Sequence, residues 1–142
     1  MFMKPEFSSL VPYRLRGGSY EYFVQKRSET VKRAPGQFGL FGGKLEPGET
    51  HEAAVLREIQ EELTYLCRPA HFWSYEFQES SLHVYIEPVE ADFESSIRVE
   101  EGEYGIFITL AEAMAEPLMN PMAATALIEI DRMLEVAKQP HM

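Results

Sequence analysis

Residues 42–65, "GGKLEPGETHEAAVLREIQEELTY", constrain the fold of this 142-residue chain more than any other stretch. Two glycines precede a Pro-Gly turn, and Thr50 is a good N-cap for a helix over about 51–64. At about 100° per residue, one stripe of that helix carries only apolar side chains, those of Val55, Leu56, Ile59 and Leu63. One face of the helix is therefore expected to pack against a sheet.

Three glutamates of the same helix fall together away from that stripe, because spacings of three and four bring Glu58, Glu61 and Glu62 onto one face. Exposed like charges at these spacings cost a helix only roughly 0.2–0.5 kcal/mol each, so a solvated acidic face is one interpretation. The other is a metal site, because Mg²⁺ takes a few carboxylates together with water and substrate phosphate. The preceding glycines let the backbone approach a ligand closely, and Arg57 is placed to hold one carboxylate through a bidentate pair. In this second interpretation the three carboxylates meet at a common point.

Strand patterns lie on both sides of this helix. Two apolar runs flank a turn at residues 17–19 and predict a hairpin, and residues 28–37 read as a polar loop. Further strands are predicted at 38–43, 71–78, 82–90 and 104–110, a helical turn at 111–115 and an amphipathic helix at 121–138. A central helix between strands, with a last helix to cover the other face, predicts one domain over residues 1–142. Its expected fold is an α/β/α sandwich with a mixed β-sheet between helices.

The composition is that of a globular protein without a disulfide framework. Hydrophobic residues make up 45% of the chain, enough for a core, and Cys67 is the single cysteine. We expect Cys67 to be a small buried hydrophobe rather than a nucleophile. No apolar run approaches the length of a membrane span, and "MFMKPEFSSL" lacks the apolar core of a signal peptide. These features predict a cytoplasmic protein that does not associate with membranes.

The net charge of −10 is unevenly distributed. Residues 1–44 carry eight Lys or Arg against three Glu, whereas residues 45–142 carry five against twenty Asp or Glu. A chain this acidic is poorly suited to gripping long nucleic acid through its phosphates. A basic lobe facing an acidic lobe suits a small phosphate ligand held with a metal ion, and ordinary solvated surface charge is the alternative for any single residue.

The spacing of Gly43, Glu49 and the run from Arg57 to Glu62 resembles the signature of the Nudix hydrolases. The resemblance is specific over residues 42–65, and elsewhere the order of elements is compatible with that family.

Two positions depart from the family pattern. Thr64 stands where glycine is usual, and Phe41 stands where many members have proline before the two glycines. A β-branched threonine resists the left-handed conformation that a glycine accepts at a helix end. We therefore expect the helix to end differently, a residue or two later.

The resemblance implies an α/β/α sandwich that hydrolyses a nucleoside diphosphate linked to another moiety, with Mg²⁺ or Mn²⁺ as cofactor. It implies metal ligation by four groups: the carboxylates of Glu58, Glu61 and Glu62 and the carbonyl of Gly42. Arg57 belongs to the same catalytic set. A glutamate beyond the motif often takes part, and Glu101 is our first choice before Glu103 and Glu100, although a solvated loop is the alternative for each of them. The general base is assigned to Glu58 or Glu101.

The resemblance also implies phosphate contacts from Arg27 and Lys44. Asn120 sits roughly where some members place a base-reading side chain, but Asn is also a good N-cap, and a cap of the last helix is the preferred interpretation. The leaving group is not predicted, and a homodimer is expected from family habit alone. The partner is thus a small nucleotide or nucleoside diphosphate derivative. The alternative function is a Nudix-fold binding or regulatory module without hydrolysis.

Other side chains of possible chemical interest are interpreted as structural. The aromatic residues of the strand at 71–78 have the alternation of a sheet face, although they could stack on a base. His51, His71 and His83 show no metal-ligand spacing.

Overall fold

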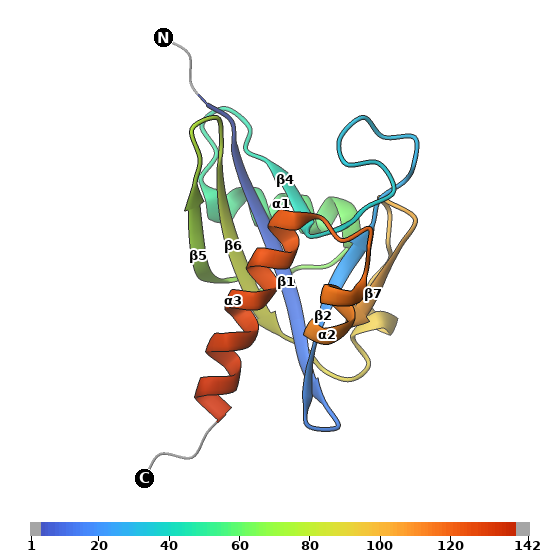
Figure 1. The fold of residues 1–142 in the computed structure, drawn as a ribbon. Coiled ribbons are helices and arrows are strands. Elements are labelled where there is room, and N and C mark those ends of the chain that lie inside the picture. The colour runs from blue at the N-terminus through green and yellow to red at the C-terminus, as the bar shows by residue number, and fades with distance from the viewer. Residues whose placement is uncertain (1–3, 139–142) are drawn as a thin grey trace.

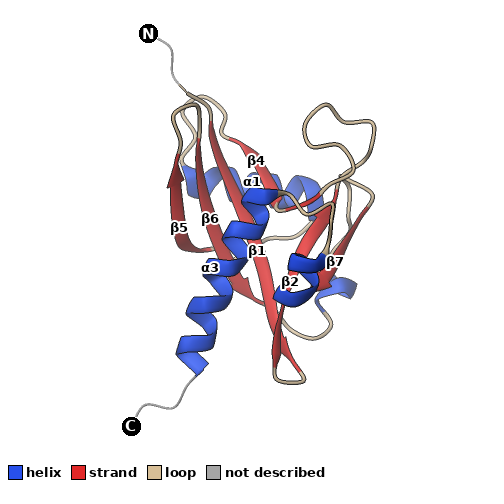
Figure 2. Ribbon diagram, viewed as in Figure 1, coloured by secondary structure: helices blue, strands red, loops and turns tan. Residues whose placement is uncertain are grey.

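The computed structural model describes residues 4–138 and contains a mixed seven-stranded sheet between helices (Figures 1 and 2). The strands are β1 (Glu6–Arg16), β2 (Ser19–Lys26), β3 (Phe38–Gly39), β4 (Phe41–Lys44), β5 (Ala70–Glu76), β6 (Ser81–Pro88) and β7 (Tyr104–Ile108). The helices are α1 (His51–Leu63), α2 (Leu110–Ala115) and α3 (Pro121–Lys138), with a 3₁₀ turn, η1, at Phe93–Ser96. The predicted α/β/α class with a mixed sheet is confirmed.

The long strand β1 organises the sheet. It pairs in parallel with β6 along one edge, and its other edge is divided between β2 and β4, both antiparallel to it. β2 in turn pairs with β3 and β7, and β5 closes the opposite end beside β6. The predicted strand over 38–43 is therefore two short strands, because β3 and β4 pair with different neighbours.

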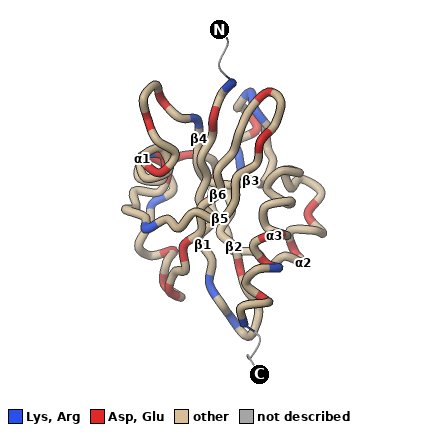
Figure 3. The backbone as a smooth tube through the Cα atoms, turned by 90° about the vertical axis from the view of Figure 1, so that its left-hand side faces the viewer, with Lys and Arg blue, Asp and Glu red and all other residues tan. Residues whose placement is uncertain are grey.

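Alternation along the strands supplies a core on each face of the sheet. Leu10 and Phe23 pack toward α1, whereas the adjacent residues Val11 and Tyr22 pack toward α3. Figure 3 shows the sheet between these layers, with α1 on one side and α2 and α3 on the other. Each fully buried aliphatic or aromatic side chain stabilises the fold by roughly 1.5–3 kcal/mol. The apolar stripe of α1 is among them, with Val55, Ile59 and Leu63 fully buried and Leu56 partly buried.

Helix α1 begins as predicted and ends differently from our expectation. The Thr50 side chain caps its N-terminus by accepting a hydrogen bond from the backbone N–H of Ala53, at 3.1 Å. At the other end, the expected extension past Thr64 is wrong: the helix stops at Leu63, and Thr64 itself takes the left-handed conformation, with φ 50° and ψ 49°.

Tertiary hydrogen bonds explain this helix end. The carbonyl of Glu62 accepts the N–H of Glu100 at 2.7 Å, and the carbonyl of Leu63 accepts the N–H of Arg98 at 2.9 Å. Another helical turn would need those two carbonyls for residues 66 and 67. The loop that crosses the helix end therefore takes the acceptors, and Thr64 adopts the conformation that a glycine would have adopted without strain.

Phe41, the second departure from the family pattern, is part of the hydrophobic core. Its ring is fully buried and stacks on Phe23, with centroids 5.4 Å apart. Cys67 is also buried, as predicted, and burial raises the pKa of its thiol to about 12. Within residues 4–138, no helix combines the length and the apolar character needed to cross a membrane.

We expect Thr64→Gly to raise the free energy of unfolding by about 1 kcal/mol, because the left-handed conformation costs an L-residue roughly 1–2 kcal/mol and glycine's unfolded-state entropy offsets only part of that gain. Denaturant unfolding measures the change. Thr125→Gly is the matched control: Thr125 is also exposed but lies inside α3, so there the change should lower stability by about 1 kcal/mol. Equal destabilisation at both positions would contradict the strain at Thr64.

Candidate active site

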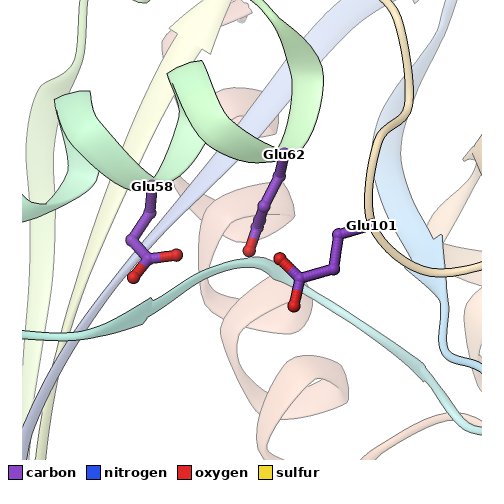
Figure 4. Close-up of side chains that lie close together, drawn as sticks. All are labelled: Glu58, Glu62 and Glu101. Atoms are coloured by element: carbon purple, nitrogen blue, oxygen red, sulfur yellow. The ribbon is translucent and has the colours of Figure 1, made fainter.

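Three carboxylates from two distant parts of the chain converge beside β4 (Figure 4). Glu58 and Glu62 project from successive turns of α1, and Glu101 reaches them from the loop before β7. One carboxylate oxygen of each residue lies within 4.8 Å of the other two. Such a cluster of acceptor-only groups is suited to binding a cation.

Glycines at positions 42 and 43 allow β4 to lie directly against these carboxylates. A Cβ on Gly43 would lie 2.5 Å from the Glu58 carboxyl carbon. A Cβ on Gly42, whose φ is 143°, would lie 2.1 Å from the carbonyl oxygen of Ser8. The N–H of Gly42 donates to Glu62 Oε1 at 2.9 Å. The close approach and the hydrogen bond both require residues without side chains at these two positions.

Backbone and side-chain contacts bring Glu101 to the cluster. The N–H of the preceding residue, Glu100, bonds to the carbonyl of Glu62, and the carbonyl of Glu101 accepts from the buried Gln25 side chain at 2.9 Å. Gly102 then turns with φ 84°, where a Cβ would lie 2.9 Å from the carbonyl of Lys26. These contacts fix the loop on both sides of the carboxylate.

Arg57 holds the surrounding elements together. Its guanidinium makes a two-pronged contact with Glu49, at 2.7 and 2.8 Å, and donates to Glu58 at 2.9 Å and to the carbonyl of Lys44 at 3.2 Å. The contact with Arg57 lowers the pKa of Glu49 to about 2, so this pair stays ionised at neutral pH. Arg57 therefore joins α1, β4 and the intervening turn, and acts on Glu58 as a positioning residue.

The two α1 carboxyls of the cluster are held in an environment that disfavours their charge. Glu62 is only 3% exposed, and burial raises its pKa to about 9 against the opposing hydrogen bond from Gly42. Burial also raises the pKa of Glu58, although Arg57 opposes the shift. A cation bound among the carboxylates would restore their ionised forms.

The structure separates the three glutamates that the helical spacing grouped together. The Glu61 side chain is 58% exposed, and its contact is with Arg57 at 3.4 Å. Glu61 and Glu62 lie on either side of Glu58 when α1 is viewed along its axis, and packing turns the Glu62 side toward the sheet. The alternatives to Glu101 also lie outside the cluster: Glu100 pairs with Arg98 at 3.0 Å, and Glu103 is exposed.

A cleft of about 580 Å³ opens beside the carboxylates, and a smaller pocket of about 150 Å³ adjoins it. Arg27 and Lys44 both line the cleft, and Arg27 also lines the pocket. Asn120 lines the pocket as well, but its Oδ1 accepts the N–H groups of Met122 and Ala123 at the start of α3. Asn120 is therefore a helix cap whose side-chain nitrogen, bonded to Gln37 at 3.0 Å, retains one further hydrogen for a ligand.

Two further residues of the cleft were not singled out from the sequence. Ser9 and Arg33 line both the cleft and the pocket. Arg33 lies in the segment read as a polar loop, where its neighbour Lys32 carries the same charge, so composition gave no signal to separate them.

The aromatic and histidine residues that were interpreted as structural pack against one another. Trp73, 44% exposed, belongs to the edge strand β5 and lies beside Tyr75, with ring centroids 6.0 Å apart. The rings of His51 and His83 stack with centroids 3.5 Å apart, and His71 packs edge-on against His83.

Comparison with known proteins identifies relatives of this chain. A family model described as the NUDIX domain matches residues 9–127. The 8-oxo-dGTP diphosphatase of Escherichia coli (strain K12) is 31% identical over 118 residues, which cover 78% of this chain and 88% of that protein. The peroxisomal coenzyme A diphosphatase NUDT7 of Mus musculus is 44% identical over 59 residues, or 41% of this chain. That match spans only 25% of the mouse protein's length.

A solved structure shares the fold. The NUDIX domain of Shewanella oneidensis NrtR, solved with ADP ribose, matches with a TM-score of 0.75 at 14% sequence identity. The match covers 94% of this chain and 90% of that one. At this identity the likeness concerns the fold alone.

We expect the metal-free protein to lose stability as the pH rises. Glu62 has a folded pKa of about 9 against an ordinary value of 4.5, so its contribution is complete below about pH 4.5 and is lost as the pH rises through 9. Thermal unfolding in a chelator, measured across this range, should show Tm falling, and Glu62→Gln should reduce the fall. Glu61→Gln, at the exposed neighbouring position, is the control and should follow the parent. Identical pH profiles for the parent and Glu62→Gln would contradict a buried, protonated Glu62.

Proposed function

The chain belongs to the Nudix family of pyrophosphohydrolases, and we propose that it cleaves a pyrophosphate bond in a nucleotide or another nucleoside diphosphate derivative with Mg²⁺ or Mn²⁺. The observation that carries the proposal is the convergence of Glu58, Glu62 and Glu101 in a cleft that basic side chains also line. Carboxylates and cations side by side match a substrate bound partly through a metal and partly through its own phosphates.

The side chains present fit a hard divalent cation. The three clustered carboxylates offer oxygen ligands, and the glycines leave no side chain between β4 and these groups. Burial disfavours the ionised forms of Glu58 and Glu62. A cation bound beside these two carboxylates would stabilise their ionised forms. We propose these three carboxylates as ligands, with the Gly42 carbonyl and Glu61 as the further ligands that the family motif assigns.

Each residue then has a distinct task. The cation, when bound, neutralises phosphate charge and lowers the pKa of an attacking water. Glu58 already accepts a hydrogen bond from Arg57, whereas Glu101 is exposed at the cleft. Of the two candidate bases, Glu101 is therefore the better placed to take a proton from water. Arg57 keeps Glu58 oriented, and Arg27 and Lys44 attract the substrate phosphates.

We expect a panel of nucleotides and nucleoside diphosphate derivatives, incubated with Mg²⁺, to identify at least one substrate. Separate detection of phosphate and pyrophosphate then shows which bond is cut. Glu58→Gln, Glu62→Gln and Glu101→Gln should each reduce turnover by about 100-fold or more, since each loses a charge at the reacting centre. The turnover of Glu61→Gln tests the exposed carboxylate: a similar loss would show that Glu61 joins the site when a metal is bound.

Glu100→Gln is the matched control for Glu101→Gln, because it alters the adjacent carboxylate, which pairs with Arg98 outside the cluster. Its turnover should equal that of the parent. Calorimetric titration with Mg²⁺ gives a reading that does not depend on turnover. Nucleotide binding without any product under Mg²⁺ or Mn²⁺ would overturn hydrolysis and favour the alternative of a binding module.

A further inference from the structure

We propose that Arg33 is a substrate-binding residue that holds, together with Arg27, the phosphate lying between the scissile bond and the organic part of the substrate. This inference rests on the proposed function, since it describes how the same cleft selects its substrate. Both arginines line the cleft and the smaller pocket, and so stand where the two cavities adjoin.

The junction is defined by the residues that the two cavities share. Besides the two arginines, these are Ser9, Leu40 and Leu82. The carboxylate cluster lies only in the cleft, whereas Asn120 and the first turn of α3 lie only in the pocket. A molecule that occupies both cavities must therefore pass between them beside Arg27 and Arg33.

Both guanidiniums lack a carboxylate partner within the described part of the chain, although acidic residues outnumber basic ones by 23 to 13. Arg57, in the same region, is by contrast held by several carboxylates. An anion bound where the two cavities adjoin would give these guanidiniums an opposite charge to interact with. Guanidinium forks also match phosphate oxygens in geometry.

The loop over residues 27–37 is folded so as to place Arg33 there. The Nε–H of Arg27 donates to the carbonyl of Arg33 at 2.9 Å, and the N–H of Arg27 donates to the carbonyl of Gln37 at 2.9 Å. Ala34 turns the chain with a left-handed φ of 46°. The loop projects at the upper right of Figure 1, so these internal bonds, rather than burial, fix its shape.

The Arg33 side chain is directed by a contact with β1. Its guanidinium carbon lies 4.5 Å from the centroid of the Phe7 ring, and Phe7 also lines the cleft. Stacking leaves the edge of the guanidinium, which carries its N–H donors, open to a ligand. Phe7 is opposite Lys44 in the β1–β4 pairing, so the ring and its arginine stand at the wall of the cleft near the glycines.

This arrangement specifies a substrate class. The favoured molecule carries negative charge along its length. A metal at the carboxylate cluster neutralises one part of that charge, and Arg27 and Arg33 at the junction neutralise the other. A nucleotide with two or more linked phosphates meets that requirement, whereas a monophosphate spans only one of the two charged regions. Arg33 is thus expected to contribute to recognition of the phosphate chain rather than to the chemical step.

The test is calorimetric titration with α,β-methylene-ADP in the presence of Mg²⁺, since this analogue keeps two linked phosphates and resists cleavage between them. Arg33→Gln should weaken binding about 10- to 100-fold, the usual loss for a charge-assisted contact. Arg33→Lys should recover part of the affinity, because lysine keeps the charge but not the fork. Lys32→Gln removes the same charge from the neighbouring position outside the cleft and should bind within about twofold of the parent.

Two results would overturn the proposal: Arg33→Gln binding as tightly as the parent, or Lys32→Gln weakened as much as Arg33→Gln. A parent protein that fails to bind the analogue at millimolar concentration would overturn it as well. Because the analogue is not turned over, these outcomes are separate from hydrolysis. A protein that binds the analogue through Arg33 but cleaves no nucleotide would refute the proposed function and leave this inference standing.

Discussion

The absence of side chains at Gly42 and Gly43 is the constraint on which the rest of the site depends. With a Cβ at either position, β4 would collide with β1 or with the Glu58 carboxyl. Glycine lets the strand lie against α1, where the Gly42 N–H reaches Glu62. That contact gives a buried carboxyl one hydrogen bond in a place where burial strongly disfavours its charge. The strand, the helix and the carboxylate cluster are therefore a single packed unit.

The end of α1 and the loop that carries Glu101 form a second such unit. The last carbonyls of a helix have no hydrogen-bond donor within it. Here the N–H groups of Arg98 and Glu100 donate to two of these carbonyls. The same two bonds place the loop, and with it the third carboxylate. The strained backbone of Thr64 follows from this arrangement, because the chain must turn away where its acceptors are already taken.

The uneven charge of the chain places basic and acidic side chains from different parts of the sequence in one cleft. The basic side chains that line it come from the first 44 residues, on β4 and on the loop between β2 and β3. The carboxylates come from α1 and the loop before β7. The two halves meet where β4 lies against α1, through the Gly42 N–H bond to Glu62, and where β2 pairs with β7. A net negative protein can thus keep a basic wall facing its acidic cluster.

The sequence by itself determined what depends on neighbours along the chain: the strand alternation, the Thr50 cap and the apolar stripe that sets how α1 packs. Tertiary structure alone decided which glutamates meet, since Glu62 is turned inward, Glu61 outward, and Glu101 arrives from almost forty residues away. It also decided the conformation of Thr64 and the place of Arg33. These outcomes rest on hydrogen bonds and packing between distant segments, and local periodicity carries no information about such contacts.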